Sequence, residues 1–400
     1  MIRKTIQTGL IALVLLTTSQ FVTGQKATAD SGYRFTLIKE LPHTGPKNQN
    51  SSSTCWSFST ISMLESELLR TGKGEYDLSD MFVVRNQYTE KAINYVRYHG
   101  TTNFGPGGGN HDIINNWKKY GMMPDEAYPG LNYGETSHVH GEMDEAMKAY
   151  LDAIIKNPNR KLSTAWLAGF NGIADAYLGK PAEKFTYKGN TYTPKSFAAE
   201  LGLNPDDYIE LTSFTHHPYF EKFTLEVEDN WAQGQVYNLP LDDLIRVIDN
   251  ALDNGYTVAW ATDISEKGFA WNKGFAVVPE TELTEMTGSE KAKWEKLTEK
   301  ERISQIYNLD KVVTERNITP EVRQAEFDNY KTTDDHGLHI VGYGKDQTGQ
   351  RFYYVKNSWG TDGIYKGYFY VSVPFVRFKT TCIMVNKQAL PVDIRQKIKL

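Results

Sequence analysis

Apolar residues recur at spacings of three and four through the first third of the chain, the period of a helix with one buried face. Residues 54–70 show this pattern well, with Ser53 or Thr54 placed to cap the start. The apolar positions on the inner face of that segment are Phe58, Ile61, Leu64 and Leu68. The same period predicts helices over residues 78–98, 110–120, 141–156 and 241–253. A glycine-rich turn, Gly105–Gly109, separates two of these helices.

The pattern changes toward the C-terminus. Residues 280–330 are rich in charge and are expected to be largely helical. Strands are predicted over residues 256–261, 338–343, 351–356 and 367–373. Helices in the first part and strands in the last indicate an α+β fold with a helical lobe, a β lobe and a site between them.

The N-terminus has the pattern of an export signal. Arg3 and Lys4 precede the apolar run Leu10–Leu16, and small residues follow at Thr23–Gly24 and Ala27–Ala29. An uncleaved membrane anchor is the alternative, but the apolar run is short for a bilayer span. We therefore expect residues 1–24 to be a signal peptide and the protein to be periplasmic or secreted. The remaining residues, 25–400, would contain no membrane span.

Charge bears on the class of partner. The 400 residues carry 44 basic and 49 acidic side chains, a net charge of −5. Cleavage after Gly24 removes Arg3 and Lys4 and leaves a charge of −7. This balance disfavours a broad phosphate-binding surface, so no nucleic-acid partner is expected.

The sequence contains two cysteines, Cys55 and Cys382. Cys382 lies in a strand-like run and is interpreted as a buried, unreactive thiol, with a Cys55–Cys382 disulfide as the alternative. Cys55 opens a predicted helix, where free backbone N–H groups and the helix dipole stabilise a thiolate. That position suits a nucleophile.

The residues around Cys55 carry a resemblance. Gln49 is followed six residues later by Cys55-Trp56-Ser57-Phe58-Ser59, which resembles the nucleophile segment of the papain family. The resemblance implies that Cys55 is the nucleophile and that the Gln49 amide helps to bind the oxyanion. Ser52 stands where many secreted members of the family have a disulfide cysteine.

Two further strings extend the resemblance. His336 lies five residues before Val341-Gly342-Tyr343-Gly344, which is where the family places its catalytic histidine. His339 is the alternative base and is interpreted as a packed or solvated strand residue. Asn357 opens Asn-Ser-Trp-Gly, so by the resemblance it orients the His336 ring, and Trp359 shields that bond. Gly107 and Gly108 resemble the strip that pairs with the substrate backbone.

The layout resembles the bleomycin hydrolase and aminopeptidase C branch of the family. Extra length falls in two inserted regions, about 138–235 and 265–333, within a peptidase domain of residues 25–400. The resemblance implies a papain-like two-lobed fold and hydrolysis of peptide bonds through a thioester acyl-enzyme, with aminopeptidase specificity. In that branch the C-terminal tail lies in the cleft, whereas residues 389–400 here are basic. An exported endopeptidase and a nucleic-acid-binding protein are the alternatives.

Other partners follow from the same reasoning. Peptides are the expected substrates, a homo-oligomer is possible, and no organic cofactor is needed. His138, His140, His216 and His217 lack a partner pair at recognised ligand spacing, so they are interpreted as surface or packing residues and no metal is expected.

Overall fold

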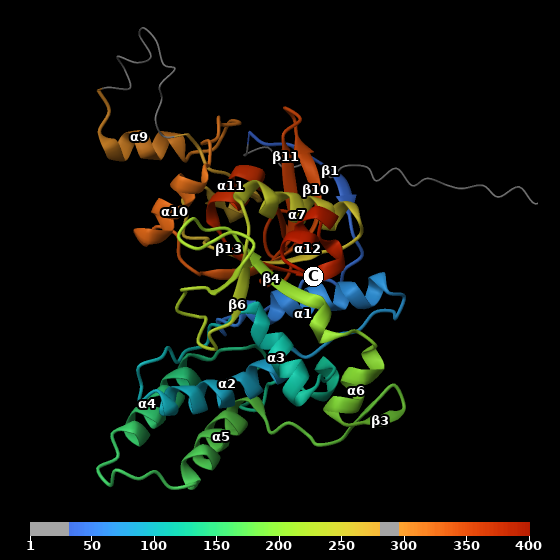
Figure 1. Cartoon of the computed structure of the whole chain (residues 1–400), viewed down its shortest axis with the longest axis vertical. Helices are drawn as coiled ribbons and strands as arrows, with labels where there is room; N and C mark the ends of the chain where they lie inside the picture. The colour runs from blue at the N-terminus through green and yellow to red at the C-terminus, as the bar shows by residue number, and fades with distance from the viewer. Residues whose placement is uncertain (1–31, 281–295) are drawn as a thin grey trace, which may run out of the picture.

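The computed structural model describes residues 32–280 and 296–400, which form a helical lobe and a sheet lobe on either side of helix α1, Cys55–Arg70 (Figure 1). One end of α1 lies in the cleft between the lobes. From Trp56 to Leu68 every residue of the helix is buried, and its apolar side chains belong to the core of the helical lobe.

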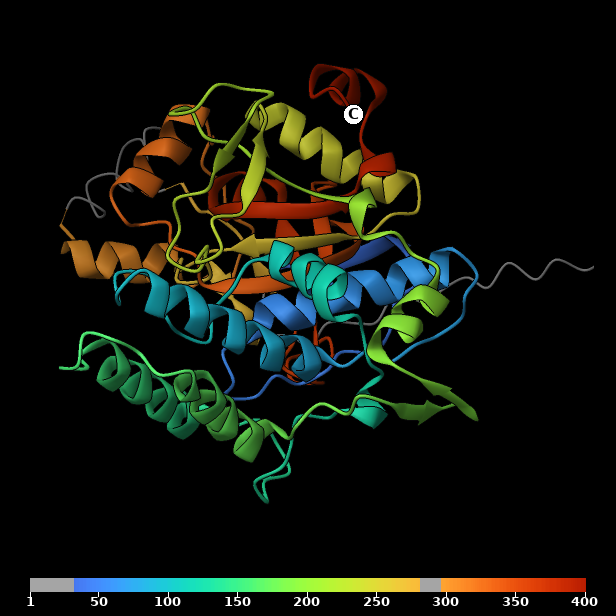
Figure 2. The same ribbon diagram turned by 60° about the horizontal axis from the view of Figure 1, so that its bottom comes forward.

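The helical lobe contains the next part of the chain. Its helices are α2 (Asp80–Arg97), α3 (Asn110–Tyr120), α4 (Gly141–Ile155), α5 (Ala165–Leu178) and α6 (Pro194–Leu201). A small hairpin of β2 (Phe185–Tyr187) and β3 (Asn190–Tyr192) lies beside α6. Helices α4 and α5 pack on the outer side of α2 (Figure 2). The buried side chains of these helices form one continuous apolar core with the inner face of α1.

The sheet lobe is built on one large mixed sheet. Its hydrogen-bonded order is β5 (Lys222–Thr224), β6 (Gln235–Asn238), β4 (Tyr208–Thr212), β13 (Thr380–Asn386), β7 (Val258–Thr262), β10 (His336–Asp346), β11 (Arg351–Lys356), β12 (Tyr368–Ser372), β9 (Phe275–Ala276) and β8 (Phe269–Ala270). Strand β1 (Phe35–Glu40) pairs antiparallel with the second half of β10, while β7 pairs with its first half. The long strand β10 thus joins the N-terminal segment to the centre of the sheet.

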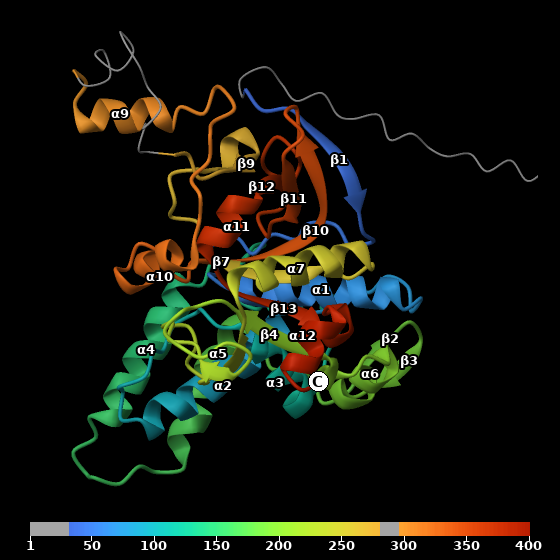
Figure 3. The same cartoon turned by 45° about the horizontal axis from the view of Figure 1, so that its top comes forward.

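Helices cover both faces of this sheet. Helix α1 packs on one face, against β10 and β7, and α7 (Leu241–Asp253) and α11 (Val373–Lys379) lie on the other (Figure 3). Helices α9 (Glu299–Ile306) and α10 (Pro320–Asp328) lie at one side of the lobe, and α12 (Val392–Lys397) ends the chain. Short 3₁₀ turns occur at Asp125–Ala127, Pro205–Asp207, Trp271–Lys273 and Lys387–Ala389.

The α+β class and the two-lobed arrangement are confirmed. The first inserted region, about 138–235, contributes to both lobes: α4, α5 and α6 pack in the helical lobe, while β4 and β5 belong to the part of the sheet beyond β13. Strand β4 pairs antiparallel with β13, far along the chain, and parallel with β6, while β5 and β6 form a local antiparallel pair. In the described part of 280–330, helix is confined to α9 and α10.

Two expectations concern the chain ends. The proposed signal peptide, residues 1–24, lies outside the described residues. In the ranges that the structure describes, no helix combines the length and apolarity needed to cross a bilayer. The C-terminal tail does not enter the cleft: Arg246 of α7 binds Asp393 over 3.0 Å, and Ile394 and Ile398 are buried in the core beneath α7.

Candidate active site

Three distant segments meet at the cleft: the first turn of α1, the start of β10 and the residues that follow β11. Gly337 makes the contact between the first two possible. A Cβ at this position would lie 2.9 Å from the Cys55 carbonyl oxygen and 2.7 Å from Ser59 Oγ. The absence of a side chain lets β10 lie directly on α1 and brings His336 to the same cavity as Cys55.

Cys55 is the first residue of α1 and keeps partial exposure to the cleft. Thr54 is the N-cap, but its side chain accepts no capping hydrogen bond, because Thr54 Oγ1 pairs with Ser52 Oγ over 2.6 Å. The capping expected from Ser53 or Thr54 is therefore wrong: Thr54 makes no such bond, and Ser53 adopts a left-handed backbone with φ of 54°. The Ser57 N–H instead donates to the Thr54 carbonyl oxygen over 2.9 Å, and the Trp56 N–H donates to the Cys55 sulfur.

Opposing effects act on the thiol. Burial raises the pKa of Cys55 to about 12, and the Asp334 and Asp229 carboxylates act in the same direction, against backbone hydrogen bonds from Gly337 and Trp56. Burial also lowers the pKa of His336 to about 4, against its bond to Asn357. Both shifts favour an uncharged thiol and imidazole at rest, so a thiolate would form by proton transfer within the pair.

The ring of His336 is held on two sides. Its Nε2 lies 2.8 Å from Asn357 Oδ1, which also accepts from the Ser358 backbone N–H over 2.7 Å. Because that oxygen accepts, His336 Nε2 donates and Nδ1 is the nitrogen left to exchange a proton. The Trp359 ring lies over the imidazole at a centroid distance of 5.0 Å.

Gln49 is also fixed by a neighbour of Asn357. Ser358 Oγ donates to Gln49 Oε1 over 2.6 Å, and Gln49 lines the same cavity as Cys55 while being buried. Since Oε1 is the end bound to Ser358, the amide nitrogen is the end free to donate to a substrate.

His339 lies elsewhere. It is fully buried, and its Nδ1 lies 2.8 Å from Ser62 Oγ of α1. It does not line the cavity that contains Cys55, whereas His336 does. The structure therefore places His339 in packing and His336 at the cleft.

The cavity has a volume of about 450 Å³ and continues from Cys55 along the glycine strip, Gly105–Gly109. Lys91, which is buried, donates to the carbonyl oxygens of Gly105 and Gly107 and holds the strip in place. A side chain at Gly108 would meet the Trp56 ring at 3.0 Å. Gly107 and Gly108 both line the cavity.

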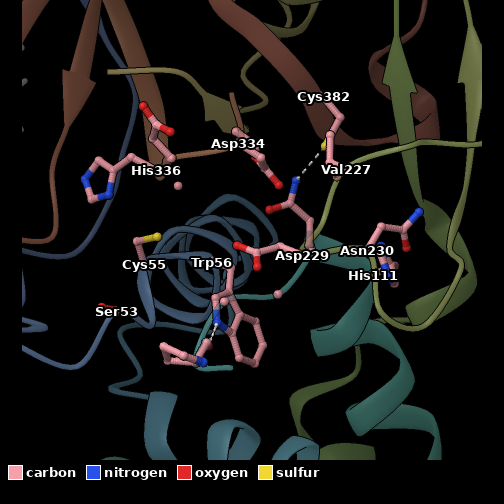
Figure 4. A pocket seen from close by; sticks show the side chains of 18 of the residues that line it. Ser53, Cys55, Trp56, His111, Val227, Asp229, Asn230, Asp334, His336 and Cys382 are labelled. Carbon is pink, nitrogen blue, oxygen red and sulfur yellow. Dashed lines mark hydrogen bonds between the residues drawn. The ribbon is translucent and has the colours of Figure 1, made fainter. Parts of the chain in front are cut away.

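Asp229 was not identified as a cleft residue from the sequence. A Cβ at Gly107 would overlap its carboxylate, so Asp229 lies directly over the glycine strip. Figure 4 shows this carboxylate pointing across the pocket toward Cys55. Trp231 fixes the segment by donating to Asp112 Oδ2 over 2.9 Å. The sequence marks Asp229 only through the string Asp229-Asn230-Trp231. That string by itself does not reveal the contact with Gly107.

The charge of the cavity is negative. Its charged lining residues are Glu210, Asp229, Asp334, Asp335 and His111, with neither Lys nor Arg in the described lining. His111 Nδ1 lies 2.9 Å from Glu210 Oε2, so these two groups pair with each other. Asp334 accepts from Thr381 Oγ1 over 3.0 Å, and burial raises its pKa to about 7. Asp229 accepts only weakly from Asn103, over 3.4 Å.

The remaining cysteine and histidines have clear positions. Cys382 is buried in β13 and both cysteines are free, so there is no Cys55–Cys382 disulfide. His138 and His140 lie against each other with ring centroids 5.6 Å apart, and burial lowers the pKa of each to about 4. His216 and His217 lie at the surface, as interpreted, where both meet Glu226, a partner that ligand spacing did not suggest.

Comparisons with known proteins agree with this geometry. Residues 3–304 match the Peptidase C1-like family, and residues 276–391 match the papain family cysteine proteases. Aminopeptidase G of Lactobacillus delbrueckii subsp. lactis is 23% identical, covering 88% of this chain and 83% of the relative. Aminopeptidase C of Streptococcus thermophilus is 21% identical, with coverage of 90% and 84%.

A solved structure shares the fold. The crystal structure of PepW from Lactobacillus rhamnosis HN001 superposes with a TM-score of 0.67 at 20% identity, covering 91% of this chain and 84% of that one. The family match spans three quarters of the sequence and agrees with the two-lobed fold and the cleft. The chain therefore belongs to the Peptidase C1-like family and is a papain-fold cysteine peptidase.

Proposed function

We propose that the protein is a cysteine aminopeptidase that removes N-terminal residues from peptides. The observation that carries the proposal is the Asp229 carboxylate over Gly107, in a cleft lined by carboxylates. Relatives named as aminopeptidases support the same specificity. A cleft of this charge disfavours a nucleic-acid ligand.

The chemistry uses four residues in the roles that the resemblance implied. The Cys55 thiol passes its proton to His336 Nδ1, and the sulfur attacks the scissile carbonyl carbon. The Gln49 amide and the Cys55 backbone N–H donate to the developing oxyanion. His336 then protonates the leaving amine, and a thioester remains on Cys55. Water, deprotonated by His336, releases the acid, while Asn357 keeps the ring in one tautomer.

The position of Asp229 determines how far the substrate extends. The first residue of a substrate has its carbonyl at Cys55, so its α-amine lies toward the glycine strip. Asp229 is placed to bind that ammonium by a charge-assisted hydrogen bond. The same carboxylate occupies the space over Gly107 that a preceding residue would need. The Asp229 side chain would thus select substrates with a free α-amine and exclude substrates that extend beyond the glycine strip.

The experiment compares a peptide amide that has a free N-terminus with the same peptide acetylated. We expect kcat/KM to be far higher for the free amine, and Cys55→Ala protein with unchanged thermal stability to hydrolyse neither. In Asp229→Asn protein the preference should fall by roughly 10-fold or more, since a charge-assisted bond contributes about 1.5–3 kcal/mol. Equal hydrolysis of both peptides by the wild-type protein would identify an endopeptidase.

We also propose that the enzyme is exported after cleavage near Gly24. Support comes from the order of charged, apolar and small residues at the N-terminus. Intact mass measurement on protein secreted by the native cell tests this proposal, because retention of residues 1–24 would contradict it.

A further inference from the structure

A second cluster of chemically active side chains lies outside the catalytic cleft. His216 and His217 follow strand β4, and Glu226 follows β5. Among the residues that the structure describes, these three side chains form a group of potential metal ligands. Their donor atoms all lie within 4.8 Å of one another. Glu226 lies 3.1 Å from His216 Nε2 and 2.8 Å from His217 Nε2.

The tautomer of His216 is fixed by its other nitrogen. His216 Nδ1 lies 3.1 Å from Gln324 Oε1, which also accepts from the Thr215 backbone N–H over 2.7 Å. The amide nitrogen of Gln324 donates to Asp328 over 2.8 Å. Rotating the amide would set two donors against each other, so Gln324 presents an acceptor and His216 Nδ1 carries the hydrogen.

The second ring nitrogen of His216 faces the cluster. Because Nδ1 faces Gln324, Nε2 is the nitrogen of His216 that lies against the Glu226 carboxylate, over 3.1 Å. His217 Nε2 lies 2.8 Å from the other oxygen of the same carboxylate. Two imidazole nitrogens and a carboxylate therefore converge on one place, where a single cation could contact all three.

We propose that His216, His217 and Glu226 bind a zinc ion. Two imidazoles and a carboxylate are the ligand types that zinc takes, with water as the fourth ligand in this exposed position. Ligand atoms on one tetrahedral ion lie roughly 3.4 Å apart, given bonds of about 2.1 Å, so only small side-chain rotations are needed. Gln324 acts as the outer partner that orients a metal-bound histidine.

Aromatic side chains pack against the two histidine rings and hold them in position. Phe223 stacks on the His217 ring at a centroid distance of 4.2 Å, and Phe327 lies parallel to the His216 ring at 6.1 Å. Glu226 stands between Leu225 and Val227, both of which line the catalytic cavity. A bound ion would brace the segment that continues to Asp229, so the site would stabilise one wall of the cleft.

Zinc binding is measured on untagged Cys55→Ala protein, which removes the catalytic thiol as a competing ligand. Titration against a chromophoric zinc chelator should show one ion per chain, and cobalt should give the visible spectrum of a tetrahedral site. Replacing Gln324 by Ala should weaken affinity by roughly 10- to 100-fold, as loss of an outer-shell partner does. Replacing His217 by Ala or Glu226 by Gln should weaken it more.

Two matched controls keep the result specific. Glu228→Gln removes an exposed carboxylate two residues from Glu226, and His99→Asn removes an exposed histidine whose left-handed backbone suits Asn. Both should bind zinc like the parent protein. Absence of stoichiometric binding in the parent overturns the proposal, as does unchanged affinity in the Gln324, His217 and Glu226 variants.

Discussion

Ser358 Oγ lies 2.6 Å from Gln49 Oε1, and the Gln49 backbone N–H donates to the Ser358 carbonyl over 2.8 Å. The preceding residue, Asn357, accepts from His336 Nε2 over 2.8 Å. Two consecutive residues after β11 thus position the proposed base and the proposed oxyanion donor, and a shift of this short segment would disturb both.

Gln49→Ala should lower kcat by roughly 10²- to 10³-fold, because removal of one oxyanion donor costs that much in other acyl-transfer enzymes. Ser358→Ala leaves the amide present but unfixed, so its loss in kcat should be smaller. KM should change little in either protein, since the bond forms in the transition state. A larger loss in Ser358→Ala than in Gln49→Ala would show that Gln49 is not the donor.

Substitutions of the two histidines of β10 should affect different properties, turnover for His336 and folding stability for His339. His336→Ala should lower turnover by roughly 10³-fold or more, because nucleophile activation and proton transfer fail together. His339→Ala should keep its turnover per folded molecule but lose about 1–3 kcal/mol of stability, since it leaves Ser62 unpaired in the core. Thermal unfolding and active-site titration measure both effects, and the reverse ranking would refute the assignment.

The segments that the sequence predicted well are those whose pattern is local. Helices α3 and α7 begin and end at the predicted residues, because a glycine turn or a proline precedes each and the apolar period is strong. Cys55, His336 and Asn357 lie in contiguous strings, so each could be found without knowing the fold.

The features that the sequence did not predict depend on distant pairings. Strand β4 is paired by β13, more than 160 residues away, and its own five residues show no alternation. The role proposed for Asp229 depends on its contact with Gly107, and the role proposed for Glu226 depends on its contact with His217. Such contacts are set by the assembled sheet and leave no local period.

The preference for a free amine should depend on pH. Burial raises the pKa of Asp229 above its usual 3.8, and Lys91 partly opposes this. As pH falls through that raised pKa, the carboxylate gains a proton and no longer attracts an ammonium. The ratio of kcat/KM for free and acetylated peptides should therefore fall at acidic pH. It should also fall above about pH 8, where the substrate amine loses its proton.

Asp229→Asn protein is the control for this profile, because its side chain does not titrate. Its ratio should be low and should lack both declines, because an uncharged amide does not distinguish an ammonium from a neutral amine by charge. A wild-type ratio that is constant from pH 4 to 7 would mean that another group binds the amine.

The C-terminal carboxylate should play no part in substrate selection. The resemblance placed the tail in the cleft, but α12 packs beside α7, and none of the residues after Cys382 lines the catalytic cavity in the described part of the chain. Deleting Lys399 and Leu400, which are exposed, removes the last two residues of the sequence and keeps the buried Ile394 and Ile398. The ratio of kcat/KM for free and acetylated peptides should be unchanged. Deleting residues 391–400 should instead destabilise the sheet lobe, because two buried isoleucines are lost at about 2–5 kcal/mol each. If the two-residue deletion lowers the ratio as strongly as Asp229→Asn does, the tail must reach the cleft in solution and Asp229 is not the main amine-binding group.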